Sequence, residues 1–436
     1  MLLVGKTGAE NVVVRGARVL DPVGGIDAVL DVRVDRGVIA QVGHDVDANG
    51  HRVVGGEGLV LAPAFVDPHV HLRTPGREDE ETISSGTAAA AAGGYCAILA
   101  MPNTDPVVDT ADVVQGLRAR AAAEAEVPVG FTAAISVGQQ GERLTEMGEL
   151  ADAGAAGFTD DGRPVASAAV MRRALEYNSI TGRAIAVHCE EPSLTRGGHM
   201  HLGAVSAELG LGGWPAVGES VGVGRELQLA ADTRQPIHLM HLSAGESVEL
   251  LQRAQAAGVR ATAEVTPHHL CLTDEDVRSL DPNLKMNPPL RSDDHRHVLI
   301  DAVRSGEIAA IATDHAPHAR EEKDVPFEAA PFGVIGLETA FAALYTYLVE
   351  PKILRLETLL ERMSAGPAAI FGLERPRIDV GATANFVLID PRSRWRVRPD
   401  AFRSRSANSW LLGKRLGSKV VLTMARGRVA FEAGPA

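Results

Sequence analysis

The chain has 436 residues, of which 45% are hydrophobic and 4% aromatic, with 45 Gly and 24 Pro. This composition is typical of a globular protein with ample core-forming residues, and the length allows two or three domains, or one large barrel with a smaller unit. The formal net charge of -13 argues against nucleic acid or an anionic membrane as a partner. Small acidic ligands would have to be bound by local positive charge or by a metal ion.

The location of the protein is predicted from its cysteines and its apolar segments. The three cysteines are widely spaced and odd in number, which does not suit a disulfide framework. Residues 1–10 lack the long apolar core of a signal peptide. The most apolar stretch, residues 87–102, is interrupted by two glycines and is better explained as a helix followed by a buried strand than as a membrane span. We therefore expect a cytoplasmic protein.

Short apolar runs alternate with longer amphipathic segments from residue 59 onward. The runs predicted as buried strands are 59–66, 96–101, 127–133, 155–159, 184–188, 236–241, 260–265 and 308–312. Helices are predicted between them, among them 111–125, 165–177, 247–257 and 293–305. Buried strands separated by helices pair in parallel, and a closed barrel accommodates them without an open edge. We predict an α/β fold whose residues 59–367 form a (β/α)8 TIM-like barrel.

The two ends of the chain have a different pattern. Residues 11–58 and 377–436 consist of short strand-like runs separated by Gly and Asp turns, with little helix. Two β-rich ends that flank a barrel can pair with each other. We therefore predict that residues 1–58 and 368–436 form one small β-sandwich domain.

Histidine and aspartate residues recur at the carboxyl ends of the predicted strands. His69 and His71 follow the first strand, and residues two apart in an extended chain face the same side, so these two can bind one metal ion. The carboxyl ends of barrel strands carry the active site in folds of this kind. The pattern therefore predicts a two-metal hydrolase site there. The other candidates are Asp160 or Asp161, His188, His241 and Asp314.

Nitrogen and oxygen donors without a thiolate suit zinc or another first-row divalent ion. We expect one ion at the first histidine pair with Asp314, and the other at His188 and His241, with an aspartate between the two ions. Asp160 and Asp161 are adjacent in a strand and point to opposite sides, so only one of them can be the bridge.

The stretch between His71 and Lys285 contains no lysine. A carbamylated lysine is one way to bridge two zinc ions, and it is excluded within this stretch. Any bridging carboxylate there must come from Asp or Glu.

Several motifs lie in order along the predicted barrel: FVDPHVHLRTPG (65–76), MPNT (101–104), FTDDG (158–162), VHCE (187–190), KMNPPLR (285–291), ATDHAPH (312–318) and PFGVIGLET (331–339). Together they resemble the dihydroorotases of the amidohydrolase superfamily, in the branch whose zinc ions are bridged by aspartate. The resemblance covers most of the chain. It implies one or two zinc ions per subunit, with Asp161 as the bridging ligand. It also implies reversible cyclisation of N-carbamoyl-L-aspartate to L-dihydroorotate in de novo pyrimidine biosynthesis.

The resemblance also assigns residues to the substrate. Arg73 leaves the first strand beside the metals, where its guanidinium can bind a carboxylate in bidentate fashion, and Asn103 on the neighbouring strand end would share that carboxylate. Asp314 is implied as the catalytic group, which takes the proton of the attacking water and passes it to the departing ring nitrogen. The remaining implied substrate contacts are Asn287, His318, Phe332 and Gly333.

Two alternatives stay open. Relatives of the hydantoinase, dihydropyrimidinase or allantoinase type open similar cyclic amides, but they typically use a carbamylated lysine, and Arg73 with Asn103 implies a carboxylate that dihydrouracil lacks. A non-catalytic scaffold for aspartate transcarbamoylase would be expected to have lost metal ligands, whereas every ligand position is filled here. We expect a small-molecule substrate, a homodimer that associates with aspartate transcarbamoylase, and neither a nucleic acid nor a membrane as partner.

Overall fold

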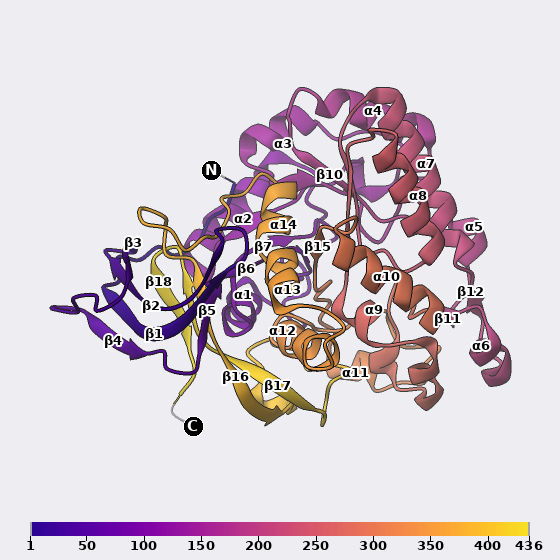
Figure 1. The fold of residues 1–436 in the computed structure, drawn as a ribbon. Coiled ribbons are helices and arrows are strands. Elements are labelled where there is room, and N and C mark those ends of the chain that lie inside the picture. The colour runs from indigo at the N-terminus through magenta and orange to yellow at the C-terminus, as the bar shows by residue number, and fades with distance from the viewer. Residues whose placement is uncertain (1, 435–436) are drawn as a thin grey trace.

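The structure, a computed structural model, describes residues 2–434 of the chain. Strands from the two ends of the chain share one eight-stranded sheet in the order β18-β17-β16-β5-β1-β2-β3, with β4 paired to β1. Figure 1 shows the indigo N-terminal strands and the yellow C-terminal strands on the same side of the molecule. The strands of this terminal sheet are β1 (Val12–Asp21), β2 (Ile26–Asp35), β3 (Val38–Gly43), β4 (Arg52–Gly55), β5 (Val60–Pro63), β16 (Phe386–Arg396), β17 (Arg415–Ala425) and β18 (Arg428–Glu432).

The terminal sheet has a hydrophobic core cluster of its own. Val14, Leu61 and Phe386 belong to it and are completely buried. Phe386 pairs with Met424 of β17 on one side and with Pro63 of β5 on the other. The C-terminal strands therefore complete a sheet that the N-terminal strands begin.

The middle of the chain contributes parallel strands connected by helices. Three of them pair as β6-β7-β8 and five as β9-β10-β13-β14-β15. Isolated parallel bridges join Ala133 to Phe158, between the two groups, and Val70 to His315, between the first strand and the segment after the last. The carboxyl ends of these strands therefore lie on one side of the molecule. The strands are β6 (Phe65–Val70), β7 (Tyr95–Ala100), β8 (Val129–Phe131), β9 (Gly157–Phe158), β10 (Ala184–Val187), β13 (Ile237–Leu239), β14 (Ala261–Val265) and β15 (Ala310–Ile311).

Helices follow most of these strands (Figure 1). Their buried apolar residues belong to the same core cluster as those of the strands. In α10, for example, the buried residues are Leu299, Ile300, Ala302 and Val303, at the spacing of one helix face. No helix within residues 2–434 combines the length and the apolar character needed to cross a membrane. The helices are α1 (Ile83–Ala92), α2 (Ala111–Glu124), α3 (Met147–Ala153), α4 (Ala168–Asn178), α5 (Pro192–Thr195), α6 (Ala204–Leu209), α7 (Val217–Thr233), α8 (Gly245–Ala256), α9 (Pro267–Cys271), α10 (Asp293–Ser305), α11 (Arg320–Lys323), α12 (Ala340–Leu344), α13 (Leu356–Met363) and α14 (Ala365–Ile370).

The predicted first strand, 59–66, is wrong in one respect, because the structure divides it between two sheets. β5 ends at Pro63 and pairs with β1 and β16 of the terminal sheet, whereas β6 begins at Phe65 and pairs with β7. The apolar run is continuous and gives no signal for this division. Pro63, however, lacks an N–H donor and is therefore suited to the end of a strand. The other predicted strands of this region are confirmed, with ends that differ by about two residues at most.

Helix α7 packs closely against the segment that carries His188. A Cβ atom on Gly222 would lie 2.9 Å from the backbone nitrogen of Glu190, which is closer than a side chain tolerates. The glycine lowers the helix propensity of α7, but it lets the helix approach the end of β10. The close packing at Gly222 therefore helps to fix the position of His188, a candidate metal ligand.

Candidate metal and substrate site

The first predicted metal group lies at the carboxyl end of β6. Ligand atoms of His69, His71 and Asp314 lie within 4.8 Å of one another. The Nε2 atom of His71 lies 3.1 Å from Oδ1 of Asp314, and Nε2 of His69 lies 3.5 Å from the same oxygen. The structure therefore brings these three side chains together as the spacing of the two histidines predicts.

Asp161 lies between this group and the second pair of histidines. Its Oδ1 atom is 3.6 Å from Nε2 of His69, 3.8 Å from Nδ1 of His188 and 3.7 Å from Nε2 of His241. Its Oδ2 atom is 3.4 Å from Nε2 of His71. The two ring nitrogens of His188 and His241 are 2.8 Å apart. One carboxylate thus faces four imidazoles.

The cluster has the properties of a site for divalent metal ions. The Nε2 atom of His69 is buried and has no hydrogen-bond partner within residues 2–434. Two ligands of a tetrahedral zinc ion lie about 3.3 Å apart, and the separations of 3.4 to 3.8 Å between Asp161 and the imidazoles are closer to that value than to a hydrogen bond. Nitrogen and oxygen donors of this kind suit zinc and its first-row neighbours.

The backbone is strained at three residues of the site. The φ angles of Arg73, His241 and Asp314 are 54°, 33° and 49°, in the left-handed region that side chains disfavour. Such a conformation costs on the order of 1–3 kcal/mol per residue and persists only where the surrounding structure imposes it. The fold therefore holds these side chains in place at the expense of local stability.

Asp160 and Asp161 follow the end of β9, and their side chains have different partners, as the alternation of an extended chain predicts. Asp160 accepts hydrogen bonds from the backbone N–H groups of Ile135 and Ser136, at 2.8 and 3.1 Å, and from the hydroxyl of Ser136. Asp161 faces the imidazoles instead. Of the two, only Asp161 is placed to be shared between metal ions.

The two carboxylates of the cluster are held in the ionised form. Burial alone would raise the pKa of Asp161, but His69, His241 and His71 around it lower that pKa well below its usual range. The same balance applies to Asp314. Burial raises its pKa, but His69 and His71 have the larger combined effect and bring the pKa below its usual range. Both side chains are therefore negatively charged near neutral pH, as ligands and proton acceptors must be.

A cavity of about 210 Å³ opens beside the cluster. Arg73 and Asn103 line it, but each already has partners within the protein. The amide oxygen of Asn103 accepts from Nδ1 of His71 at 2.9 Å, and its amide nitrogen donates to Oδ2 of Asp161 at 3.3 Å. Asn103 thus orients two candidate metal ligands, a role that the sequence did not predict. All the predicted site residues except the buried His69 line this cavity: His71, Arg73, Asn103, Asp161, His188, His241, Asn287, Asp314, His318, Phe332 and Gly333.

The remaining predicted substrate contacts line the same cavity. Asn287 lines the cavity, and its Oδ1 atom is buried without a hydrogen-bond partner within residues 2–434. Nε2 of His318 donates to the carbonyl of Phe332 at 2.8 Å. The N–H group of Gly333 donates to the carbonyl of Lys285 at 2.8 Å. Gly333 therefore has only its carbonyl oxygen to offer a ligand.

Comparison with known proteins agrees with this geometry. A family model described as dihydro-orotase-like matches residues 58–247. The dihydroorotase of Geobacter metallireducens is 42% identical to this chain over 423 residues, which cover 97% of this chain and 100% of the relative. The dihydroorotase of Geobacillus thermodenitrificans is 43% identical over 407 residues, which cover 93% and 95%. This chain belongs to the dihydroorotase family.

Solved structures that resemble this dihydroorotase-family chain are cyclic-amide hydrolases. The L-hydantoinase (dihydropyrimidinase) from Arthrobacter aurescens superposes with a TM-score of 0.87 at 26% identity, over 98% of this chain and 97% of that chain. The dihydropyrimidinase from Brevibacillus agri gives a TM-score of 0.83 at 21% identity, over 96% and 94%. The resemblance to dihydroorotases that the motifs predict is therefore confirmed. The solved structures show that the fold is shared with a hydantoinase and a dihydropyrimidinase.

Two acidic residues contact the ring nitrogens of candidate metal ligands that face away from the cluster. Glu264, in β14, accepts from Nδ1 of His69 at 2.7 Å, and Glu190 lies 3.0 Å from Nε2 of His188. Sequence reasoning missed both. A glutamate inside the predicted buried strand 260–265 is the signal that points to Glu264, because an acid buried there requires a partner.

Asn408 braces the substrate side of the cavity from the C-terminal segment. Its Oδ1 atom accepts from the backbone N–H of His318 at 3.1 Å, and its Nδ2 atom donates to the carbonyls of Ala316 and Gly333 at 3.0 and 3.3 Å. It therefore ties the segment after β15 to the segment around Gly333. Nothing in the sequence near Asn408 signals this contact.

Proposed function

We propose that this protein is a dihydroorotase, which interconverts N-carbamoyl-L-aspartate and L-dihydroorotate and closes the ring in de novo pyrimidine synthesis. The observation that carries this proposal is the position of Arg73, whose guanidinium lines the same cavity as the candidate metal cluster. A half-buried guanidinium beside such a cluster favours an anionic substrate. Dihydroorotate carries a carboxylate next to its ring amide, which suits both features.

We infer zinc as the metal, with one or two ions per subunit. Bound at the cluster, it would supply the Lewis acidity that ionises a water molecule near neutral pH and polarises the ring carbonyl. The residues proposed to hold one ion are His69, His71 and Asp314, those proposed for the other are His188 and His241, and Asp161 is proposed to bind both.

Asp314 is the proposed catalytic residue. The ionised carboxylate lies 3.1 Å from Nε2 of His71 and lines the cavity. In ring opening it would accept a proton from the attacking water and deliver it to the ring nitrogen as the amide bond breaks. Ring closure would use the same proton in the reverse order. Its strained backbone favours a fixed direction for this transfer.

The rest of the cavity suits the rest of the substrate. Arg73 would bind the carboxylate with its terminal amino groups. The unpartnered oxygen of Asn287 suits a ring N–H, and a lone buried acceptor of this kind costs free energy until a ligand satisfies it. His318, Phe332 and the carbonyl of Gly333 would complete the wall, with Asn103 in contact with both the cluster and the substrate.

The fold supports this proposal. The parallel pairings and the bridges at Val70 and Ala133 favour a closed (β/α)8 barrel over residues 59–367, with the site at its carboxyl end. The separate core of the terminal sheet favours a second domain from residues 1–58 and 368–436, in which the single eight-stranded sheet would fold over itself as the predicted β-sandwich. β5 belongs to that sheet, so the boundary near residue 59 falls a few residues early. It also remains a prediction that the protein is a cytoplasmic homodimer and that it associates with aspartate transcarbamoylase.

Turnover of dihydroorotate, dihydrouracil and allantoin by the same zinc-loaded sample tests the proposed function. We expect dihydroorotate to be hydrolysed and the other two, which lack its ring carboxylate, to be turned over at least about a hundredfold more slowly, because a site built for a charged group is left unpaired without it. Preference for dihydrouracil or allantoin would favour a hydantoinase or allantoinase. Failure to turn over any of the three would favour the non-catalytic scaffold.

A further inference from the structure

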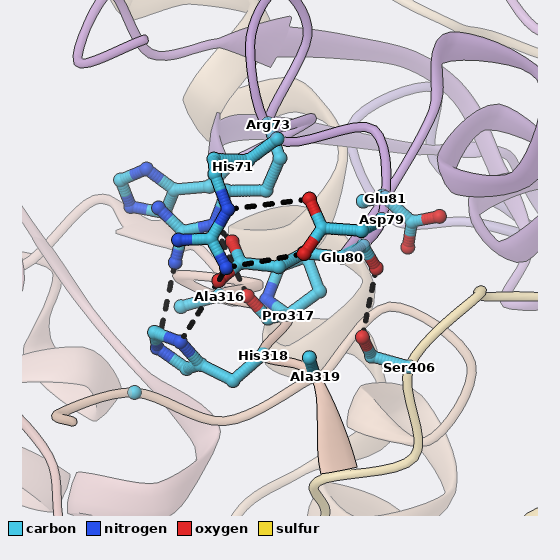
Figure 2. Close-up of polar contacts among 12 residues, drawn as sticks. His71, Arg73, Asp79, Glu80, Glu81, Ala316, Pro317, His318, Ala319 and Ser406 are labelled. Atoms are coloured by element: carbon cyan, nitrogen blue, oxygen red, sulfur yellow. Dashed lines mark hydrogen bonds and ion pairs between the residues drawn. The ribbon is translucent and has the colours of Figure 1, made fainter. Parts of the chain in front are cut away.

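Glu80 is a buried carboxylate that binds two arginines. The residue is only 2% exposed, although it lies in the charged run GREDEE. Its Oε2 atom is 2.9 Å from Nε of Arg73, and its Oε1 atom is 2.9 Å from a terminal nitrogen of Arg77. Its backbone carbonyl accepts a hydrogen bond from the hydroxyl of Ser406 at 2.7 Å. Figure 2 shows this carboxylate turned toward Arg73, with Ser406 on the side away from Arg73.

His318 lies against the same carboxylate. Its Nδ1 atom is 3.5 Å from Oε1 of Glu80 and 3.6 Å from Glu322. The other ring nitrogen must carry a hydrogen, because its partner is the carbonyl of Phe332. Glu80 therefore contacts both Arg73 and His318, two proposed substrate contacts that follow different strands. Arg73 and His318 also face each other, with a terminal nitrogen of Arg73 3.5 Å from Nε2 of His318 (Figure 2).

The charges in this cluster argue against a further metal ion. Glu80, His318 and Glu322 lie close enough to hold a cation. However, Arg77 already pairs with Glu322 at 2.8 Å and with Glu80, and Arg73 pairs with Glu80 from the other side. Two guanidinium groups balance the two carboxylates, so an added divalent ion would be repelled. The cluster is better suited to fixing side chains than to binding metal.

We propose that Glu80 is a positioning residue, which fixes the guanidinium of Arg73 for the substrate carboxylate and sets His318 beside it. Glu80 and the carbonyl of Pro317, 3.1 Å away, both take the Nε side of Arg73. Of the two terminal amino groups, one lies 3.5 Å from Nε2 of His318, and we assign both as donors for a bidentate contact with the substrate. This inference rests on the proposed function, because it takes dihydroorotate as the substrate.

Two opposite effects decide the outcome of removing the charge of Glu80. Without its partner, Arg73 loses its fixed orientation, and a misplaced binding group weakens substrate binding strongly. On the other hand, Glu80 offsets part of the positive charge of Arg73, so its loss would strengthen the attraction for an anion. We expect orientation to dominate, because Glu80 and Pro317 anchor Nε of Arg73, and the direction of the terminal amino groups that would bind the anion depends on this anchor.

The first test compares Glu80→Gln with Asp79→Asn, whose side chain is 57% exposed and pairs with Arg77. We expect Glu80→Gln to raise the KM for dihydroorotate about tenfold with kcat changed less than about threefold and zinc content unchanged. Asp79→Asn should match the wild type. An unchanged or lower KM in Glu80→Gln would overturn the proposal, whereas a wild type without turnover would overturn the proposed function instead.

A second test separates positioning from general stability. If Glu80 acts through Arg73, then Glu80→Gln should lower kcat/KM about tenfold in the wild type but less than about twofold in an Arg73→Ala background. Equal losses in both backgrounds would contradict the proposal. If Glu80→Gln does not fold, Glu80→Asp replaces it, since it keeps the charge but withdraws the carboxylate by one methylene. We then expect a rise in KM of about threefold, and an unchanged KM would count against the idea.

Discussion

Glu264 accepts a hydrogen bond from Nδ1 of His69 over 2.7 Å, while its other oxygen lies 3.0 Å from Nε2 of His238. Burial alone would raise the pKa of Glu264, but the two histidines lower it to about 2. The charged carboxylate thus fixes the proton of His69 on Nδ1. The lone pair of Nε2 is left to face Asp161 and Asp314.

This relationship predicts that Glu264→Gln weakens metal binding. The amide cannot fix the tautomer of His69 as a carboxylate does, and the loss of such a supporting group typically costs 10- to 100-fold in metal affinity, so we expect about that range. A zinc titration against a competing chelator measures it. Glu249→Gln, at a side chain 63% exposed in a surface pair, is the control. Equal zinc affinity in both variants would show that Glu264 does not contribute to metal binding.

The neighbours Asp160 and Asp161 provide a matched pair of substitutions. We expect Asp161→Asn to lose at least one zinc ion per subunit, because a neutral amide cannot be shared by two cations. Asp160→Asn should keep the zinc and lose about 1–3 kcal/mol of unfolding free energy, because it weakens buried hydrogen bonds to Ile135 and Ser136. Metal analysis and chemical denaturation test the pair. The reverse pattern would show that Asp160 is the shared ligand.

The clustering of the candidate metal ligands could be predicted from sequence because their positions follow from strand geometry. His69 and His71 are two residues apart in an extended segment, and parallel strands end on the same side of the fold, so His188, His241 and Asp314 had to lie near them. Strand parity alone showed that only one of the two aspartates faces the cluster. The resemblance to dihydroorotases was needed to select the second of them.

The supporting residues could not be predicted in this way. Glu80 lies in a charged run that is typical of a solvated loop, and only the two arginines that fold onto it explain its burial. Asn408 contacts His318 from 90 residues further along the chain. No periodicity links such positions, because the contact depends on how the C-terminal segment packs over the cavity.

Asp314→Asn tests the proposed proton transfer. The amide still offers an oxygen ligand, so we expect most of the zinc to be retained. It cannot accept a proton, and removal of a general base typically costs 10²- to 10⁴-fold, so kcat should fall by about that factor. Steady-state kinetics on samples of measured zinc content provide the comparison. A variant with near wild-type kcat would rule out Asp314 as the proton carrier.

Glu338 gives the protein a pH-dependent stability away from the site. Burial raises the pKa of Glu338 from 4.5 to about 7, although its carboxylate accepts from the backbone of Arg403 and Ser404. The folded state therefore holds a proton that the unfolded state releases, and stability falls as the pH rises from about 4.5 to about 7. The side chain is partly exposed, so we expect a loss of about 1–3 kcal/mol.

Glu338→Gln should remove this contribution, since its side chain does not titrate. Denaturation of both proteins at pH 5 and pH 8, at the same zinc concentration, gives the comparison. We expect the difference between the two pH values to shrink in the variant. An equal difference in both proteins would show that Glu338 titrates normally in the folded state.

The absence of lysine between His71 and Lys285 predicts that the metal centre assembles without CO2. Reconstitution of chelated protein with zinc should restore the same activity with or without added bicarbonate. Activity that rises with bicarbonate would show that a carbamylated lysine from outside this stretch takes the place of Asp161.

The most direct test of the account is to measure zinc content and dihydroorotate hydrolysis on one purified sample, before chelation, after chelation and after zinc is returned. We predict that turnover disappears with the metal and returns in proportion to the zinc bound, up to two ions per subunit. Full turnover of dihydroorotate in metal-free protein would contradict the account.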